Sequence, residues 1–235
     1  MTRLASRPDA PNGVTKKKGY VPALGYNALT AFYDLVVLTT RERTFKKALI
    51  GQAHIANGDR VLDLACGTGT MTLWIKMENP GAEVTGLDGD PKILSRARAK
   101  AAESGIAIHF DEGLSYELPY PDGAFDRVLS SLFFHHLTPA DKLRTAHEVF
   151  RVLRPGGELH VADWGKAANG LMRFLFYGIQ LLDGFATTTD SVLGRLPDSF
   201  SSAGFEGVSV TSEFSTVFGT MTLYRASRPS VPTEG

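Results

Sequence analysis

The segment VLDLACGTG at positions 61–69 constrains the fold more than any other part of the chain. It begins as a short apolar strand, Arg60–Ala65, and runs into a turn that contains Gly67 and Gly69. Glycine suits such a turn because the backbone bends sharply and a ligand can approach it closely. A helix is predicted to follow over Thr70–Asn79. This order predicts the strand–turn–helix unit of a nucleotide-binding α/β sheet.

Two aspartates define the ligand chemistry of this unit. Asp88 ends the next predicted strand, Glu83–Leu87, where a carboxylate can accept hydrogen bonds from both hydroxyls of a ribose. Asp63 lies inside the first strand, where it would repel a pyrophosphate but suit an ammonium group. Thr72 stands where a dinucleotide-binding turn has its third glycine. The pattern therefore predicts an adenosine-type ligand without phosphate, such as S-adenosylmethionine, at the carboxyl ends of a parallel sheet.

Strands and helices alternate after this unit, which is typical of an α/β domain with a parallel sheet. Asp90 is predicted to cap a helix that starts at Pro91, and Thr138 is predicted to cap another. The further predicted elements are strands at 106–110, 126–132 and 158–162, a helix near 196–203, and two β-like runs at 207–214 and 217–224.

Composition indicates an ordinary globular chain. Of the 235 residues, 43% are hydrophobic and 21% are charged. Lysine plus arginine equals aspartate plus glutamate, at 25 each, so the chain lacks the positive excess of proteins that bind nucleic acid. A single cysteine excludes an internal disulfide and a multi-cysteine metal site. We expect no metal.

One folded domain is predicted over 25–226, between a flexible basic tail at 1–24 and a short flexible tail at 227–235. The charged run at 41–47 predicts a solvated helix face. No window is apolar enough to span a bilayer, and the first residues lack the apolar stretch of a signal peptide. We therefore expect a cytoplasmic protein.

Several motifs in a fixed order identify a family. The matching segments are VLDLACGTG at 61–69, VTGLDGD at 84–90, LPYPDGAFDRV at 118–128, EVFRVLRPGGELHVAD at 148–163 and AGF at 203–205. With them the chain resembles the class I S-adenosylmethionine-dependent methyltransferases. The most similar subgroup is the ubiquinone/menaquinone C-methyltransferase-like one, and the resemblance covers 25–226.

The resemblance implies a Rossmann-like, doubly wound sheet of seven strands. The sheet would be mostly parallel with an antiparallel final strand, and helices would cover both faces. A helical lid would lie between strands five and six, at about 164–195. The resemblance also implies an enzyme that transfers a methyl group from S-adenosylmethionine and leaves S-adenosylhomocysteine as product.

The resemblance also assigns cofactor-binding residues. Asp63 would help hold the amino group, Asp88 would bind the ribose hydroxyls with Gly89 beside them, and Ser131 would lie under the methionine moiety. Tyr33 matches a residue that often covers the cofactor, with packing in the core as its alternative. The other candidates line the turn or follow the third strand: Ala65, Gly67, Thr68, Gly69, Leu114 and Ser115.

The chain departs from the family where adenine would bind. Members often have Gly-Asp-Ala where this chain has Gly113-Leu114-Ser115, and the aspartate reaches the adenine amino group. Leu114 cannot accept that hydrogen bond. Adenine would then be held by backbone groups, by apolar contact with Leu114, or by the carboxylate of Asp111 or Glu112.

Methyl transfer from a sulfonium needs little chemistry from the protein. The enzyme must hold the acceptor about 3 Å from the methyl carbon, in a dry pocket. A general base is needed only if the acceptor must lose a proton. The candidates are His135 and His136, after the fourth strand, and Asp163, which ends the fifth. As alternatives, the histidines form a hydrogen-bonding wall and Asp163 caps the following segment.

The stretch Leu171–Leu182 is apolar nearly all round, which is typical of a helix buried on more than one side. We expect it to form, with Trp164, a lid in which Phe174 and Tyr177 select the acceptor; core packing is the alternative for Tyr177. This favours a small apolar or amphipathic acceptor of the quinone-precursor type.

Other functions and partners remain open at this stage. One is a lipid or amine N-methyltransferase at a membrane surface, which the basic run Lys16–Lys18 and the apolar helix would contact. Another is a non-catalytic module that binds S-adenosylmethionine. The apolar helix could also face a second copy of the chain, which would make a homodimer.

Overall fold

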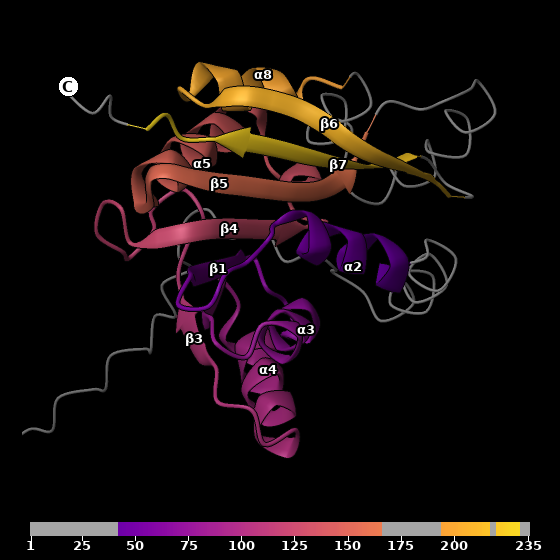
Figure 1. The fold of residues 1–235 in the computed structure, drawn as a ribbon, viewed down its shortest axis with the longest axis vertical. Coiled ribbons are helices and arrows are strands. Elements are labelled where there is room, and N and C mark those ends of the chain that lie inside the picture. Colours follow the sequence, from indigo (N-terminus) through magenta and orange to yellow (C-terminus); the bar gives the residue numbers. More distant parts are fainter. Residues whose placement is uncertain (1–41, 166–193, 217–219, 231–235) are drawn as a thin grey trace, which may run out of the picture.

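The computed structural model describes residues 42–165, 194–216 and 220–230 (Figure 1). Its elements in chain order are α2 (Glu42–Gln52), β1 (Arg60–Leu64), α3 (Thr70–Glu78), β2 (Glu83–Asp88), α4 (Pro91–Glu103), β3 (His109–Glu112), β4 (Phe125–Ser131), the short 3-10 helix η1 (Phe134–His136), α5 (Pro139–Val152), β5 (Leu153–Trp164), α8 (Leu196–Ser202), β6 (Glu206–Ser215) and β7 (Thr220–Ser227).

The strands of the described residues form one seven-stranded sheet in the order β3-β2-β1-β4-β5-β7-β6. The pairs from β3 across to β5 are parallel, whereas β7 runs antiparallel to both of its neighbours. This confirms the predicted doubly wound sheet with an antiparallel final strand. No helix in the described part of the chain is long and apolar enough to cross a membrane.

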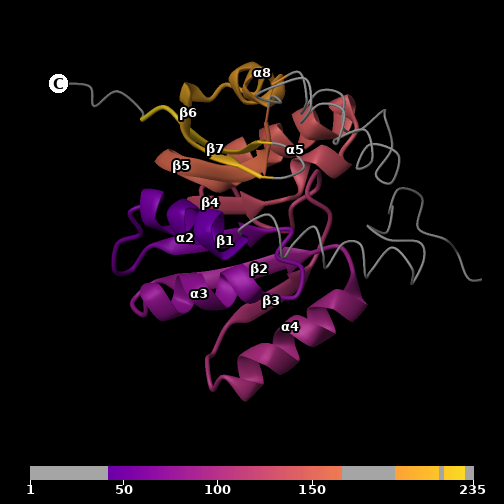
Figure 2. The ribbon, with the colours of Figure 1, turned by 90° about the vertical axis from the view of Figure 1, so that its right-hand side faces the viewer.

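Helices cover both faces of the sheet. Alternate strand residues point to opposite faces, so Leu62 and Leu64 pack with apolar residues of α5 and α8, while Val61 and Leu129 pack with those of α2 and α3. Figure 2 shows α5 and α8 on the other side of the sheet from α2 and α3. Both faces are therefore buried, as the apolar strand sequences require.

The edges of the sheet are irregular. At one edge, β3 has four residues. At the other edge, the pairing of β6 with β7 shifts register twice, between Glu206 and Ser209 and again between Val210 and Ser212. Val210 is 51% exposed on this edge.

The helix caps agree with the sequence. The Asp90 side chain accepts the backbone N–H of Lys92 at 2.8 Å, and Pro91 opens α4. Thr138 accepts the N–H of Asp141 at 3.2 Å at the start of α5. Each cap satisfies a backbone donor that has no partner within its own helix.

The third strand was predicted too early, at 106–110, whereas β3 begins at His109. The preceding residues still close α4: Gly105 adopts a positive φ of 65°, and the N–H of Ile106 donates to the carbonyl of Ala101 at 3.1 Å. An N–H used by the helix end is not available to a strand. The apolar Ile108 packs against the helix cluster instead.

The chain after β7 is fastened to the end of α5. Arg228 Nη1 donates to the carbonyl oxygens of Phe150, Arg151 and Leu153 at 2.9, 3.0 and 2.6 Å. The guanidinium carbon also lies 4.8 Å from the centroid of the Phe150 ring. The last carbonyls of a helix have no partner within it, so this arginine completes α5.

Replacing Arg228 by methionine is expected to lower the free energy of unfolding by about 2 kcal/mol, because three carbonyls lose a charged donor. Urea denaturation would measure this as a fall in the midpoint at constant slope. The control is Arg96→Met on the exposed face of α4. Equal losses of unfolding free energy in Arg228→Met and Arg96→Met would show that the hydrogen bonds of Arg228 to the end of α5 do not stabilise the protein.

Candidate functional site

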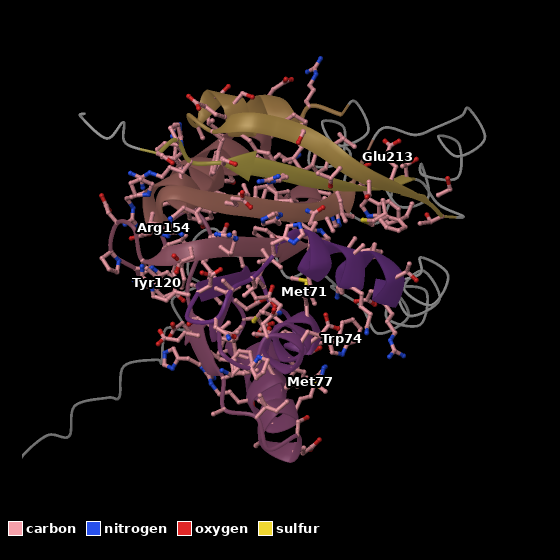
Figure 3. The ribbon with its side chains drawn as sticks, viewed as in Figure 1. Met71, Trp74, Met77, Tyr120, Arg154 and Glu213 are labelled. Atoms are coloured by element: carbon pink, nitrogen blue, oxygen red, sulfur yellow. The ribbon has the colours of Figure 1, made fainter. Side chains whose placement is uncertain are left out.

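The predicted site residues that the structure describes lie at or after the carboxyl ends of β1, β2, β3, β4 and β5. The chain leaves the central strand β1 toward β2 on one side, and β4 pairs with its other side. Ligands of open α/β sheets bind at the carboxyl ends of the strands, where the strand order reverses. In Figure 3, Arg154 lies at the far end of the sheet, where β5 begins, and Glu213 lies toward the end where β5 finishes.

The turn after β1 combines open space with backbone strain. A Cβ atom added to Gly67, whose φ is 56°, would meet no atom of the described residues within 4 Å. One added to Gly69 would meet Ala97 Cβ at 3.0 Å and the Phe110 ring at 3.1 Å. Ala65 also has a positive φ, of 58°, which is unfavourable for alanine. Gly69 therefore serves packing, while Gly67 borders free space where a ligand can approach the backbone.

Asp88 holds this turn in place. Its Oδ2 accepts the N–H of Gly67 at 2.9 Å, and its Oδ1 accepts the N–H of Asp90 at 3.0 Å. Burial raises the pKa of Asp88 above its ordinary value, and these two N–H groups oppose the rise. A carboxylate oxygen has two acceptor sites, so both oxygens keep capacity for a ligand hydroxyl. Gly89 follows directly.

Asp63 is a buried carboxyl group with one satisfied oxygen. The residue is 1% exposed, and Thr72 Oγ1 donates to its Oδ2 over 2.6 Å. Its Oδ1 is buried and has no hydrogen-bond partner among the residues that the structure describes. Burial raises the pKa of Asp63 to about 7, although the Thr72 hydrogen bond and the charge of Lys46 lower it. An unpaired buried acceptor of this kind fits a donor from a ligand.

Ser131 supplies a second unpaired oxygen on the same face. Its Oγ is buried and likewise lacks a partner in the described part of the chain. Asp63 is in register with Leu129 of β4, and Ser131 lies two residues further along that strand. Side chains two residues apart share a face. Asp63 and Ser131 therefore face the same layer, which contains α2 and α3.

Lys46 corrects the prediction that the charged run at 41–47 is a solvated face. Its side chain is only 13% exposed and forms an ion pair with Glu42, one turn earlier. Lys47 is 48% exposed and pairs with Glu78 of α3 at 3.3 Å. The run lies on a helix that packs against the sheet, so one side of it is covered.

A histidine and an aspartate pair across the ends of β4 and β5. His135 Nδ1 lies 2.7 Å from Asp163 Oδ1, and the His135 N–H donates to Oδ2 at 3.2 Å. Asp163 has no exposed surface, and the N–H of Trp164 also donates to it. Burial disfavours the carboxylate, but His135 more than compensates, so the pKa of Asp163 lies below its ordinary value. An ionised Asp163 accepts a hydrogen bond from His135 Nδ1, so Nε2 is the ring nitrogen that Asp163 does not contact.

His136 differs sharply from its neighbour. The two imidazole rings lie with centroids 3.9 Å apart. Burial, together with the charge of His135, lowers the pKa of His136 to about 3. His136 is thus neutral near pH 7 and a weak base.

The hydroxyl of Ser115, in the segment after β3, contacts helix α5. Ser115 Oγ hydrogen-bonds Thr145 Oγ1 of α5 at 2.9 Å, in a buried position. Leu114 forms an isolated antiparallel bridge with Glu117. The Ser115 hydroxyl is thus engaged in packing the segment against α5.

Asp111 and Glu112, the two carboxylates predicted as alternatives for binding adenine, both belong to β3 but have different neighbours. Asp111 accepts the Tyr120 hydroxyl at 2.9 Å and lies 2.8 Å from His109 Nε2. Glu112 pairs in register with Asp88 and so lies beside it on the same face. Asp111 pairs with Leu87 instead, so it points to the opposite face of the sheet from Asp88.

Of the remaining predicted site residues, Trp164 and Thr68 belong to the described part of the chain and the others do not. Trp164 belongs to β5 and is buried with the apolar residues of α2, so it is a core residue rather than part of the predicted lid. Thr68 Oγ1 accepts Lys100 Nζ of α4 at 3.1 Å. Tyr33, Phe174 and Tyr177, with the helix predicted at 171–182 and the basic tail, lie outside the described residues.

Sequence reasoning missed two contributors, Thr72 and Lys46. Thr72 was noted only as the absence of a third glycine, yet a threonine in the first turn of α3 can reach back to a carboxylate in β1. That signal was present in the sequence. The approach of Lys46 depends on how α2 packs, which no local pattern specifies.

Known proteins resemble this chain in sequence and in fold. Residues 61–157 match the family model described as "Methyltransferase domain". The chain is 34% identical over 169 residues to demethylmenaquinone methyltransferase of Deinococcus radiodurans, covering 71% of this chain and 69% of that protein. It is 39% identical over 145 residues to the demethylmenaquinone methyltransferase of Thermus thermophilus, covering 60% and 65% of the two chains.

Among solved structures, the YcgJ protein of Bacillus subtilis superposes with a TM-score of 0.67 at 18% identity. The superposition covers 79% of this chain and 98% of that one. At this level of identity the likeness establishes the fold alone.

Proposed function

The chain belongs to the class I S-adenosylmethionine-dependent methyltransferases of the quinone methyltransferase-like type, and from this premise we propose that it methylates a small apolar or amphipathic acceptor of the quinone-precursor type. The observation that carries the choice of acceptor is the buried His135–Asp163 pair. A base is required only when the acceptor must lose a proton, as a hydroquinone does when its ring carbon gains a methyl group.

The residues at the ends of β1 and β4 suit the amino-acid end of the cofactor. An ammonium group would donate to the unpaired Asp63 Oδ1, with the unpaired Ser131 Oγ on the same face. The open space at Gly67 leaves room for it beside the turn. The backbone of Ala65, Thr68 and Gly69 would line the same end.

The ribose and adenine would lie along β2 and β3. Asp88 would accept the two ribose hydroxyls, with Gly89 beside them. Leu114 and Ser115 would border the adenine by apolar and backbone contact, and Glu112 is the carboxylate aligned with Asp88. When bound, S-adenosylmethionine supplies a methyl group on a sulfonium and leaves as S-adenosylhomocysteine.

The protein then has to position the acceptor and take one proton. His135 Nε2 would accept the proton of the acceptor hydroxyl as the ring carbon gains its methyl group. That carbon would then lose its ring hydrogen as a proton to solvent while the imidazolium returns its proton to the oxygen, which restores the aromatic quinol. Asp163 would act as a positioning residue, because it holds the proton on Nδ1 and stabilises the imidazolium that forms. Neutral His136 would pack beside this pair and form part of the wall.

Asp88→Ala is expected to weaken binding of S-adenosylmethionine about 10- to 100-fold while the fold survives, since two charge-assisted hydrogen bonds are lost. Calorimetric titration would measure this. The control is Asp122→Ala, an exposed carboxylate beside Arg151, remote from the turn. Unchanged affinity in Asp88→Ala would remove this residue from the ribose site.

The acceptor is tested by methyl transfer from labelled S-adenosylmethionine to a panel of one demethylated quinol, a simple phenol, ethanolamine phosphate and phospholipid vesicles. The proposal expects label on a ring carbon of the quinol. Label on an amine or lipid headgroup would favour an N-methyltransferase at a membrane surface. Cofactor binding without transfer to any acceptor would favour a non-catalytic module.

A further inference from the structure

Asp63 occupies an unusual position for a carboxyl group. It lies within β1, an interior strand of the sheet, is 1% exposed, and has one oxygen without a partner in the described residues. Its other oxygen accepts the hydroxyl of Thr72, and the backbone N–H of Thr72 also favours the carboxylate. Burying an ionised carboxylate is unfavourable unless hydrogen bonds or an opposite charge compensate it.

Charged and titratable groups face Asp63 from the neighbouring elements. Lys46 of α2 brings a positive charge that Glu42 already pairs, and Asp88 of β2 brings a negative one. The Cys66 thiol of the turn is kept neutral, because burial and the two aspartates raise its pKa. The surroundings therefore provide little net positive charge, and Asp63 is poorly compensated without a ligand.

We propose that Asp63 is protonated in much of the free protein and loses its proton when an amino-acid-bearing nucleoside binds, so that cofactor binding is coupled to proton release. The inference rests on the proposed function, since it takes the ligand to be S-adenosylmethionine or its product. The ammonium of the ligand provides the positive charge that the site lacks. The Asp63 O–H bond breaks, the proton passes to solvent, and the carboxylate then pairs with the ammonium.

Asp63 titrates near pH 7 in the free protein, because burial raises its pKa. Below that pH most Asp63 side chains are protonated. Each must lose its proton before it can pair with the ammonium of the ligand, so the affinity for the ligand falls as the pH falls. Affinity is expected to rise about 15-fold from pH 5.5 to pH 7. Proton release is expected to be about 0.9 per ligand at pH 6 and about 0.5 at pH 7. The α-ammonium of the ligand stays protonated over this window.

The experiment is calorimetry with S-adenosylhomocysteine, which carries the same amino-acid end and does not react. Titrations at pH 5.5, 6 and 7, each in two buffers of different ionisation enthalpy, give the affinity and the number of protons released. The comparison ligand is methylthioadenosine, which keeps adenine and ribose but lacks the amino acid. Methylthioadenosine controls for Asp88, because burial raises the pKa of Asp88 as well and this carboxylate is proposed to bind the ribose. Binding of methylthioadenosine should release almost no proton.

Three variants locate the proton. Asp63→Asn should bind more weakly and release none. Thr72→Val removes the hydrogen bond that favours the carboxylate, so release at pH 7 should rise above one half. Ser131→Ala is the matched control: it removes the neighbouring unpaired hydroxyl, and affinity should fall by the same factor at every pH with unchanged proton release.

The unmodified protein tests the proposal even if a variant fails to fold. Binding of S-adenosylhomocysteine with no proton release, or with equal release on binding methylthioadenosine, would overturn the coupling and leave the methyltransferase function intact. No binding of S-adenosylhomocysteine at any pH would instead overturn the cofactor site itself.

Discussion

Replacement of Gly67 by valine is expected to abolish measurable binding of S-adenosylmethionine, a loss of more than about 100-fold. Gly67 has a φ of 56°, and the position where a Cβ would lie is open. A β-branched side chain is unfavourable at this φ by roughly 1–2 kcal/mol. The larger effect is steric, because the branched side chain would occupy the space that the ligand needs beside the turn.

A matched control separates the two effects. Gly58 also has a positive φ, of 86°, and equally open surroundings, but it precedes β1 at the opposite end of the strand. Gly58→Val and Gly67→Val should lose similar stability in urea denaturation, whereas calorimetry should find weakened cofactor binding only in Gly67→Val. Near-native binding by Gly67→Val would mean that this turn is only a connection.

Replacement of His135 by glutamine is expected to lower kcat about 100- to 10,000-fold, the usual contribution of a general base. Glutamine keeps hydrogen-bonding capacity toward Asp163 but cannot take up the proton. Asp163→Asn should lower kcat substantially as well, because an amide does not hold the proton on Nδ1. Cofactor affinity should change less than about threefold in both variants, since neither residue is proposed to touch the cofactor.

The measurement is kcat and KM for the quinol acceptor, together with calorimetry for the cofactor. His147→Gln, an exposed histidine on α5, is the control and should keep full activity. Similar activity in His135→Gln and the unmodified protein would mean that the acceptor loses its proton to water. A large loss of kcat in His136→Gln, with little loss in His135→Gln, would show that His136 is the base instead of His135.

The sequence specifies the sheet and its connections well, because those signals are local. The glycine turn after β1, the cap at Asp90 and the cap at Thr138 each depend on residues within a few positions of one another. Periodicity and caps therefore predict elements reliably. The start of β3 was missed because Ile106 and Ile108 look like strand residues, whereas the N–H of Ile106 closes α4 and Ile108 packs against the helix cluster.

The site itself is only partly readable from sequence. The residue types at Asp63, Asp88 and Ser131 follow from the motif, but the unpaired oxygens do not, because they depend on burial. The choice of His135 over His136 likewise depends on which ring reaches Asp163, a residue far along the chain. Such distinctions arise from packing between distant segments, which local patterns do not encode.

The irregular edges of the sheet carry a consequence for the chain at high concentration. A continuous row of unpaired N–H and C=O groups would template growth by further strands, as in amyloid. The two register shifts in β6 interrupt that row beside the exposed Val210, and β3 offers only four residues at the other edge. Neither edge of the described sheet gives an incoming strand a long straight partner, so the geometry of both edges disfavours the addition of a further strand.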